Sequence, residues 1–230
     1  MNDVLGQAIS DFYHKQLLSK LWIHNKYGKK EEMPLATYFR VAAEMPDLEL
    51  IALQNCAGKV LDIGAGAGSH ALELQEKGFD VTALEISEEA AAVMKLRGVE
   101  KVIQQDIFSF DGKLFDTLLL LMNGIGLTGN ITGLRQFLQH TKILLHPSGQ
   151  LLFDSSDVAY LYDNDILEMN HYYGEILYRY HYKKQKTEWF SWLYIDQKTL
   201  IEVAGEEGWK TEILFVDEYD QYLAKLIRNR

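Results

Sequence analysis

The 230-residue chain is poor in the residues that build disulfides and metal sites. Its only cysteine is Cys56, so no intramolecular disulfide can form, and a single thiol suits a reducing compartment. No cysteine–histidine pattern has zinc-site spacing, and His140 and His146 stand six residues apart, which is wrong for neighbouring ligands on one helical face. We therefore expect a cytoplasmic protein without a metal centre.

Long apolar runs and proline are also scarce. The longest uninterrupted apolar run near the middle, Leu118 to Met122, is far shorter than the ~20 residues of a membrane-spanning helix. The N-terminus lacks the basic start and apolar stretch of a signal peptide. Only three prolines occur, so no proline-rich linker separates domains. These absences favour a single domain over residues 1–230 that does not contact a membrane.

Positive charge is in deficit. The chain has 23 lysines and arginines against 33 aspartates and glutamates, which gives a formal net charge of −10. A surface of that sign repels phosphate backbones, so we expect no nucleic-acid partner. Apolar residues make up 47% and charged residues 24% of the chain, which is ordinary for a globular domain. The oligomeric state stays open from sequence.

The first 57 residues predict a helical N-terminal cap. Apolar residues at positions 4, 5, 8, 9 and 12 recur at helical spacing and predict a helix over 2–24. A turn is expected at 28–32, and Pro46 with Asp47 suits the start of a second helix over 47–55.

Strands and helices alternate from residue 58 to residue 157, which predicts a parallel sheet with helices on both faces. A helix over 197–204 and two strands joined by a brief link follow in residues 196–230, and the brief link predicts an antiparallel hairpin at the sheet edge. The predicted strands are 60–63, 80–84, 99–103, 115–122, 150–153, 211–216 and 222–227, and the helices of the core are 69–77, 87–96 and 134–145.

The most informative stretch is the turn VLDIGAGAG at residues 60–68. Gly64, Gly66 and Gly68 end a strand and open a helix, so a ligand can approach the backbone without interference from Cβ atoms. The spacing is GxGxG, whereas dinucleotide-binding turns use GxGxxG and would need glycine where Ser69 stands. The turn therefore indicates a nucleoside ligand of another kind.

Polar residues follow the predicted strands at intervals that suit this ligand. Asp62 would serve little purpose beside a diphosphate but suits a cation, which favours a phosphate-free nucleoside bearing an amino acid. Glu85, 21 residues after Gly64, is placed to accept hydrogen bonds from both ribose hydroxyls, and Asp106 could accept from an adenine amino group. Asn123 follows the fourth strand, where the crevice of the sheet should open.

The runs VLDIGAGAG, ALEIS, QQDIF and FDTLLLLMNG together resemble class I S-adenosylmethionine (AdoMet)-dependent methyltransferases over about residues 58–155. The resemblance implies a Rossmann-like, doubly wound α/β fold with a mostly parallel seven-stranded sheet, an antiparallel edge hairpin, and AdoMet as cofactor. It implies that Asp62 and the three glycines wall the methionine side, that Glu85 binds ribose, and that Asp106 and Ile107 flank adenine. The predicted cofactor site is completed by Ala65, Ile86, Asn123, Tyr38 and Arg40.

The acceptor is less defined. The fourth-strand motif runs from Met122 to Gly126 and departs from the NPPY type of the amino-methylating DNA and protein enzymes, which favours a small-molecule acceptor and leaves the attacking atom open. Residues 158–195 contain eight of the thirteen tyrosines, and an aromatic row alternates at period two over 176–194, which predicts a hairpin. This row either packs on the domain or lines an acceptor pocket.

Two side chains of the cap and three candidate bases complete the predictions. Tyr38 and Arg40 would fold over the cofactor, and the guanidinium of Arg40 either binds the methionine carboxylate or lies on the surface. No catalytic base is assigned; the candidates are His70, Asp154 and His171.

Three other functions compete with methyl transfer to a small molecule. A nicotinamide-dependent oxidoreductase would use Glu85 on the ribose, although Ser69 and Asp62 count against it. A non-catalytic AdoMet-binding or AdoMet-sensing protein would keep the fold without the chemistry. A protein-modifying enzyme would dock its partner on the aromatic hairpin.

Overall fold

The computed structural model describes residues 3–16, 19–26, 28–112, 114–162 and 170–229. The chain divides into two compact units, each built from separate stretches of sequence. The first unit contains Met1–Met45, Leu61–Phe110 and Leu177–Phe190, and the second contains Pro46–Val60, Asp111–Ile176 and Ser191–Arg230.

The larger of two sheets has seven strands in the order β11-β12-β7-β6-β3-β4-β5. β4 pairs with β5 and β6 with β7 in parallel, whereas β12 runs antiparallel to both β7 and β11. This confirms the predicted Rossmann-like sheet and its antiparallel C-terminal hairpin. The strands are β3 (Lys59–Ile63), β4 (Asp80–Glu85), β5 (Val102–Gln104), β6 (Phe115–Leu120), β7 (Leu145–Ser156), β11 (Trp209–Val216) and β12 (Gln221–Arg228).

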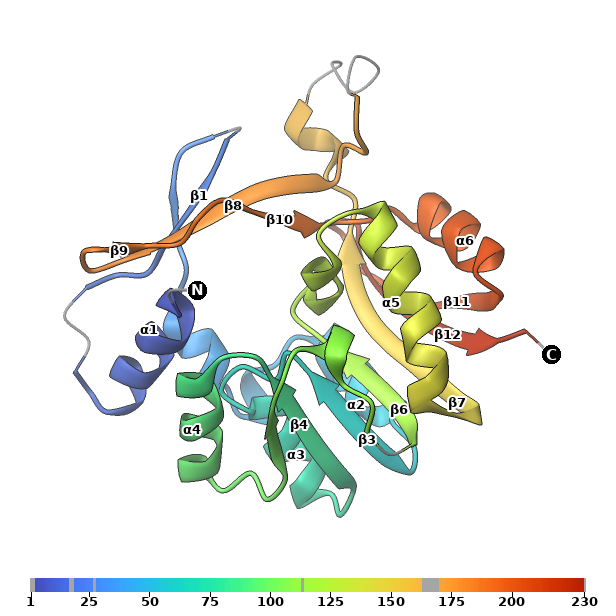
Figure 1. The fold of residues 1–230 in the computed structure, drawn as a ribbon, viewed down its shortest axis with the longest axis horizontal. Helices are drawn as coiled ribbons and strands as arrows, with labels where there is room; N and C mark the ends of the chain where they lie inside the picture. The colour runs from blue at the N-terminus through green and yellow to red at the C-terminus, as the bar shows by residue number, and fades with distance from the viewer. Residues whose placement is uncertain (1–2, 17–18, 27, 113, 163–169, 230) are drawn as a thin grey trace. The chain divides into compact units, whose positions relative to one another are not determined.

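The helices of the first unit begin and end where the sequence supplies caps. In α4 the Ser87 hydroxyl accepts the Ala90 N–H at 2.9 Å, and Gly98 ends the helix at a φ of +99°, a conformation that glycine adopts without strain. Figure 1 shows α1 alongside α4, with which it shares many contacts. The helical segments of this unit are α1 (Val4–Tyr13), η1 (Leu35–Phe39), η2 (Ala42–Glu44), α3 (Ser69–Glu76), α4 (Glu88–Arg97) and η3 (Ile107–Ser109).

The prediction of one helix over residues 2–24 is wrong. α1 ends at Tyr13, where the apolar repeat also stops, and Trp22–Asn25 form strand β1. β1 pairs antiparallel with β2 and with β8, so its backbone groups are satisfied by strands that the local sequence does not reveal. Asn2 and residues 17–18 of the predicted helix lie outside the described residues.

The smaller sheet joins the predicted aromatic hairpin to the N-terminal strands. Its order is β10-β8-β1-β2, and the short β9 pairs with β8. The hairpin prediction is therefore confirmed for β8 and β10, but the participation of β1 and β2 was not foreseen; residues 163–169 of the predicted insertion lie outside the described residues. The remaining strands are β2 (Glu31–Glu32), β8 (Glu175–Tyr182), β9 (Gln185–Lys186) and β10 (Phe190–Leu193).

The core of the first unit encloses a buried polar group. α1 buries Ala8 and Ile9 in a cluster that also contains Tyr182, which is 1% exposed. The Tyr182 hydroxyl donates to Asp11 at 2.9 Å, and the Lys183 ammonium reaches the same carboxylate at 2.5 Å. The carboxylate of Asp11 is thus satisfied, and it ties α1 to β8.

Removing the Tyr182 hydroxyl should destabilise the protein. Tyr182→Phe leaves the buried Asp11 carboxylate with one donor fewer, so we expect the free energy of unfolding to fall by about 1–3 kcal/mol. Urea denaturation followed by circular dichroism measures this change. Tyr219→Phe, at a side chain that is 76% exposed, is the matched control and should change the free energy of unfolding by less than about 0.5 kcal/mol. Equal stabilities of the two variants would contradict the assignment.

The second unit has its own core and helices. The indole of Trp209 is 1% exposed and donates to the Leu138 carbonyl at 3.2 Å, which fixes β11 against α5. β7 begins at Leu145 rather than at residue 150, because Leu145 already pairs with Phe115 before the register shifts. The helical segments here are α2 (Asp47–Gln54), η4 (Gly124–Thr128), α5 (Ile131–Leu144), η5 (Ala159–Tyr162) and α6 (Gln197–Glu206). Across the described part of the chain, no helix combines the length and the apolar character needed to cross a membrane.

Candidate functional site

The predicted glycine turn lies between β3 and α3 in the first unit. Gly64, Gly66 and Gly68 have φ angles of +70°, +56° and +84°, which side chains rarely adopt. A Cβ on Gly64 would meet no atom within 4 Å, so this glycine borders open space. A Cβ on Gly68 would instead press on Val99 at 2.8 Å and Met94 at 3.0 Å, so this glycine is required for packing. The turn thus leaves room for a ligand at its first glycine.

Backbone hydrogen bonds bring the ends of three strands together at this turn. The N–H groups of Gly64 and Ala65 donate to the Leu84 carbonyl at 2.8 and 3.2 Å. The Gln105 N–H donates to the Glu85 carbonyl at 3.0 Å, which places Asp106 beside the end of β4. The predicted residues of β3, β4 and β5 therefore share one edge of the first unit.

Asp62 is a buried carboxylate, and one of its oxygens can still accept a hydrogen bond. Its side chain is 2% exposed, and its Oδ2 has no hydrogen-bond partner in the structure. Burial raises the pKa of Asp62 to about 6, against the opposing effects of the nearby His70 ring and the Ala71 N–H. A buried, unpartnered carboxylate oxygen is costly unless a donor or cation approaches it. This observation fits a cationic ligand at the turn.

Glu85 holds the turn and keeps acceptor sites free. One carboxylate oxygen accepts the Gly66 N–H at 2.8 Å, and the other accepts the Ser87 N–H at 2.9 Å. Burial raises its pKa, and the two N–H groups partly offset this effect. A carboxylate has about four lone-pair sites, so sites remain for two ribose hydroxyls. The residue can therefore order the turn and bind a sugar at the same time.

The residues predicted around adenine lie next to Glu85. Ile86 is 63% exposed, which is unusual for isoleucine and suits a flat apolar ligand. Ile107 is buried, and the exposed Asp106 caps η3 by accepting the Phe108 N–H at 3.0 Å. This bond uses one Asp106 oxygen and leaves the other available, so the adenine contact stays a prediction.

Tyr38 covers the turn from the N-terminal segment. Its ring lies 3.1 Å from the position of a Cβ on Gly66. The Ser69 hydroxyl donates to the Tyr38 carbonyl at 2.8 Å, and Arg97 donates to the Ala67 carbonyl at 2.6 Å. Arg40 follows at the end of η1, and its predicted contact with a carboxylate stays a prediction.

Sequence reasoning missed the residues that fasten α1 to this site. The Ser87 hydroxyl donates to Asp3 at 2.6 Å, and the Asp3 carboxylate also accepts the Gly6 N–H at 2.9 Å. The predicted cap of α4 by Ser87 was a usable local signal. No local sequence signal predicts its contact with Asp3, which lies 84 residues away in the chain.

Asn123 lies in the second unit, where it is held by β7. Met122 and Asn123 both have left-handed φ angles, of 61° and 54°, directly after β6. The Asn123 N–H donates to both oxygens of Asp154 at 3.0 and 2.9 Å, and its side-chain oxygen accepts from Ser155 at 3.1 Å. Such backbone strain in ordinary residues is typical of functional loops. A cofactor contact of Asn123 stays a prediction.

Three candidate bases occupy different surroundings. His70 is 7% exposed in the first turn of α3, where it opposes the effect of burial on the pKa of Asp62. Burial raises the pKa of Asp154 to about 6, but both oxygens are engaged by Asn123, and Gln221 donates to one of them at 2.9 Å. His171 is exposed, with Nδ1 3.0 Å from the Tyr172 carbonyl. Asp154 therefore positions a loop, and none of the three is assigned as base.

Polar and aromatic side chains gather near the end of β7 in the second unit. The Tyr173 hydroxyl donates to Asp157 at 2.8 Å, and the Tyr172 hydroxyl donates to Asp196 at 2.6 Å. A pocket of about 210 Å³ opens beside these two aspartates. Its lining residues are Asp157, Asp196, Gln197, Lys198, Asp220 and Tyr222.

Comparison with known proteins decides the family. Residues 36–212 match the methyltransferase domain family. A solved structure of an AdoMet-dependent methyltransferase from Bacteroides fragilis, in complex with S-adenosyl-L-homocysteine, is 41% identical, with a TM-score of 0.92 over 99% of this chain and 95% of that one. The chain belongs to the AdoMet-dependent methyltransferases.

Two more distant matches are consistent with the family. YqeM of Bacillus subtilis (strain 168), named as a putative methyltransferase, is 32% identical over 104 residues; the match spans 42% of each protein. The sugar N-methyltransferase KedS8 from Streptoalloteichus has 16% identity and a TM-score of 0.58 over 89% of this chain and 96% of that one, and shows the fold alone.

The cofactor of this methyltransferase is AdoMet, as the sequence predicted. The unpartnered oxygen of Asp62 fits the ammonium group of the methionine moiety, and the remaining lone pairs of Glu85 fit the ribose hydroxyls. The open space at Gly64 lets the ligand reach the backbone.

Proposed function

We propose that this methyltransferase transfers the AdoMet methyl group to a small-molecule acceptor. The proposal rests on the packing of the loop after β6 against the indole of Trp192. A Cβ on Gly126 would overlap the ring of Trp192, and Gly129 lies against Ser191 of the same strand, β10. Trp192 of β10 therefore forms an aromatic wall against this loop, and the loop lacks the NPPY residues of enzymes that methylate nucleic-acid bases and protein side-chain amides.

The residues of the turn supply binding and orientation. When bound, AdoMet supplies a methyl group already activated on a sulfonium. The Asp62 carboxylate binds the positively charged part of the ligand, Glu85 binds the sugar, and Tyr38 shields the turn from water. Methyl transfer is an in-line displacement, so fixed orientation and exclusion of water provide most of the rate.

The second unit, taken by itself, carries groups that suit a polar acceptor. Trp192 offers a flat apolar surface, and the carboxylates of Asp157 and Asp196 beside the pocket suit hydroxyl or amino groups of a polar molecule. KedS8, which shares the fold, is a sugar N-methyltransferase.

Radiolabel partition tests the proposal. The purified protein is incubated with methyl-tritiated AdoMet and a lysate of its source organism, which is then separated into small-molecule, protein and nucleic-acid fractions. We expect label in the small-molecule fraction. Label in a protein band or in nucleic acid would contradict the proposal, and cofactor binding without any labelled product would favour the AdoMet-sensing alternative.

A methyl group on Gly126 should impair use of the acceptor. Gly126→Ala places a Cβ where the Trp192 indole lies, so the ring must move, and we expect the acceptor KM to rise about 10-fold or more. Affinity for S-adenosylhomocysteine, measured by calorimetry, should stay within about threefold. Gly205→Ala is the matched control, because a Cβ there meets no atom within 4 Å. An unchanged acceptor KM in Gly126→Ala would refute the role of this wall.

A further inference from the structure

One side of the smaller sheet turns away from the core of the first unit. In the β1–β8 pair, Trp22 lies opposite His181 and His24 opposite Arg179, so these four side chains share one side. The other side carries Tyr182, which packs in the α1 cluster. We name the basic face after the basic and aromatic residues of the first side, which are Trp22, His24, Lys30, Arg179, His181 and Lys186. Glu32, opposite Trp22, lies on the same side and forms an ion pair with Lys20.

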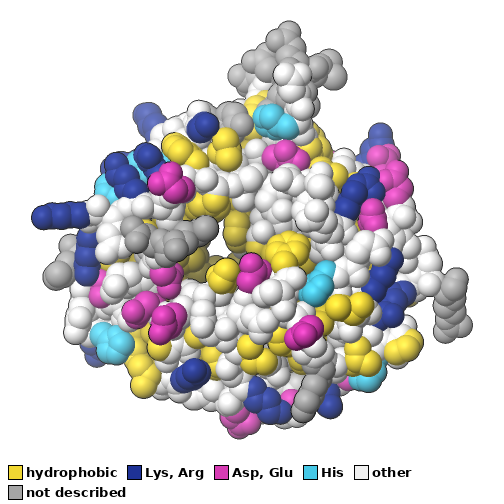
Figure 2. All heavy atoms as spheres, in the orientation of Figure 1, with side chains coloured by type: hydrophobic (Ala, Val, Ile, Leu, Met, Phe, Trp, Pro, Cys, Tyr) yellow, Lys and Arg dark blue, Asp and Glu magenta, His cyan; other side chains and the backbone are white. Residues whose placement is uncertain are grey.

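The segments that form the basic face carry a net positive charge, whereas the rest of the protein is negatively charged. Residues 20–32 and 177–190 contain eight lysines and arginines and three glutamates, a formal charge of +5. The rest of the chain contains fifteen basic and thirty acidic residues, a formal charge of −15. Figure 2 shows lysine, arginine and histidine side chains gathered where Figure 1 places β8 and β9. This concentration of positive charge is local.

The cations of the basic face are held in place without carboxylate partners. Lys30 lies 4.1 Å from the ring centre of Trp22, and the Arg179 guanidinium lies 4.7 Å from that of Trp189. Within the described ranges, neither cation forms an ion pair with a carboxylate. The Arg179 Nε and the His24 Nε2 are buried and have no hydrogen-bond partner. The two aromatic contacts therefore order the Lys30 and Arg179 cations without neutralising their charge.

The titration of His24 agrees with this arrangement. Burial lowers its pKa, and the neighbouring charges of Arg179, His181, Lys186 and Lys30 lower it further. Its ring lies 5.8 Å from the ring of His181. The groups that lower the pKa of His24 thus come from β8, from β9 and from Lys30, which directly precedes β2.

We propose that the basic face docks a short acidic segment of a partner protein. β1 is four residues long and β8 eight, so the face extends for about 25 Å, the length of a short peptide segment. A long nucleic acid would continue over surface of the opposite charge, and cations cover the indole rings on which bases would stack. Carboxylates suit both the guanidinium of Arg179 and the ammonium groups of Lys30 and Lys186.

Binding of defined probes tests the proposal. Fluorescence anisotropy is measured with a labelled twelve-residue peptide of glutamate and glycine, a (dT)12 oligonucleotide, and the labelled protein with vesicles containing phosphatidylserine. We expect the peptide to bind more tightly than the other probes, with a Kd that rises as salt is added. Lys30→Glu/Lys186→Glu should raise this Kd at least 10-fold.

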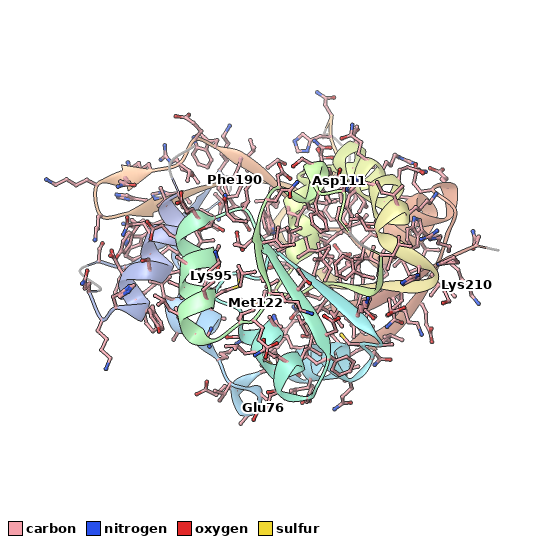
Figure 3. All side chains as sticks on the ribbon, turned by 60° about the horizontal axis from the view of Figure 1, so that its bottom comes forward. Glu76, Lys95, Asp111, Met122, Phe190 and Lys210 are labelled. Carbon is pink, nitrogen blue, oxygen red and sulfur yellow. The ribbon has the colours of Figure 1, made fainter. Side chains whose placement is uncertain are left out.

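Controls separate the basic face from net charge and from folding. Lys59→Glu/Lys210→Glu makes the same charge change at exposed lysines outside the face (Lys210 is labelled in Figure 3) and should leave the peptide Kd within twofold. Lys30→Gln/Lys186→Gln is a milder variant that should raise the Kd by an intermediate factor, and S-adenosylhomocysteine affinity in every variant confirms the fold. Tighter binding of DNA or vesicles, equal loss in the control pair, or salt-sensitive self-association that Lys30→Glu/Lys186→Glu abolishes would overturn the proposal.

Discussion

Glu85→Gln should weaken the binding of S-adenosylhomocysteine by about 100-fold or more. The change removes a charged acceptor from two ribose hydroxyls, and hydrogen bonds to charged groups contribute about 1.5–3 kcal/mol each. It also weakens the bonds that fix the Gly66 and Ser87 N–H groups, now 2.8 and 2.9 Å from the carboxylate. Titration calorimetry measures the dissociation constant. Glu76→Gln, at an exposed glutamate that ends α3 (Figure 3), is the control and should change nothing.

A second ligand separates sugar binding from support of the turn. The 2′-deoxy analogue of S-adenosylhomocysteine lacks one hydroxyl, so wild-type protein should bind it at least 10-fold more weakly than the parent ligand. Glu85→Gln should discriminate much less between the two ligands, because the acceptor is already lost. Equal discrimination by both proteins would show that Glu85 acts only on the turn.

Affinity for AdoMet should fall about 10-fold when the pH is lowered from 7.5 to 5. Burial raises the pKa of Asp62 to about 6, and a bound cation favours the ionised carboxylate. Protonation of Asp62 therefore competes with binding below pH 6, whereas above pH 7 the affinity should reach a plateau. Calorimetry across this range measures the dependence.

Asp62→Asn assigns that pH dependence to one residue. The amide keeps the shape of the side chain but cannot ionise, so affinity at pH 7.5 should fall at least 10-fold and the loss between pH 7.5 and 5 should shrink. The pKa of Glu85 is also raised, mainly by burial, so a smaller slope should remain. A slope as steep as that of the wild-type protein would place the titrating group elsewhere. Asp80→Asn, at an exposed end of β4, should behave as the wild type.

The glycine turn between β3 and α3 could be predicted because its signals are local. The strand, the glycines and the helix cap lie within a few residues of one another, and Glu85 follows at the end of the next strand. Gly64 and Gly68 have positive φ angles, which only glycine adopts without strain. The glycines in the sequence therefore indicate this backbone conformation directly. The parallel sheet followed from alternating periodicity for the same reason.

Contacts between distant segments could not be predicted in the same way. Trp22–Asn25 became a strand because β8, far along the chain, supplies its hydrogen-bond partners, and nothing in the local sequence reveals that pairing. Asn123 was correctly placed at the end of a strand. Its hydrogen bond to Asp154, 31 residues away, depends on the pairing of two strands and could not be predicted. The two cationic indole contacts of the basic face arise from the same long-range pairing.

The most direct test is calorimetric titration of the Asp62→Asn/Glu85→Gln double variant with AdoMet, alongside the wild-type protein with AdoMet and with NAD+. The account predicts micromolar binding of AdoMet to the wild type, no heat from NAD+, and no measurable AdoMet binding to a double variant whose circular dichroism matches the wild type. Undiminished AdoMet affinity in that folded double variant would contradict it.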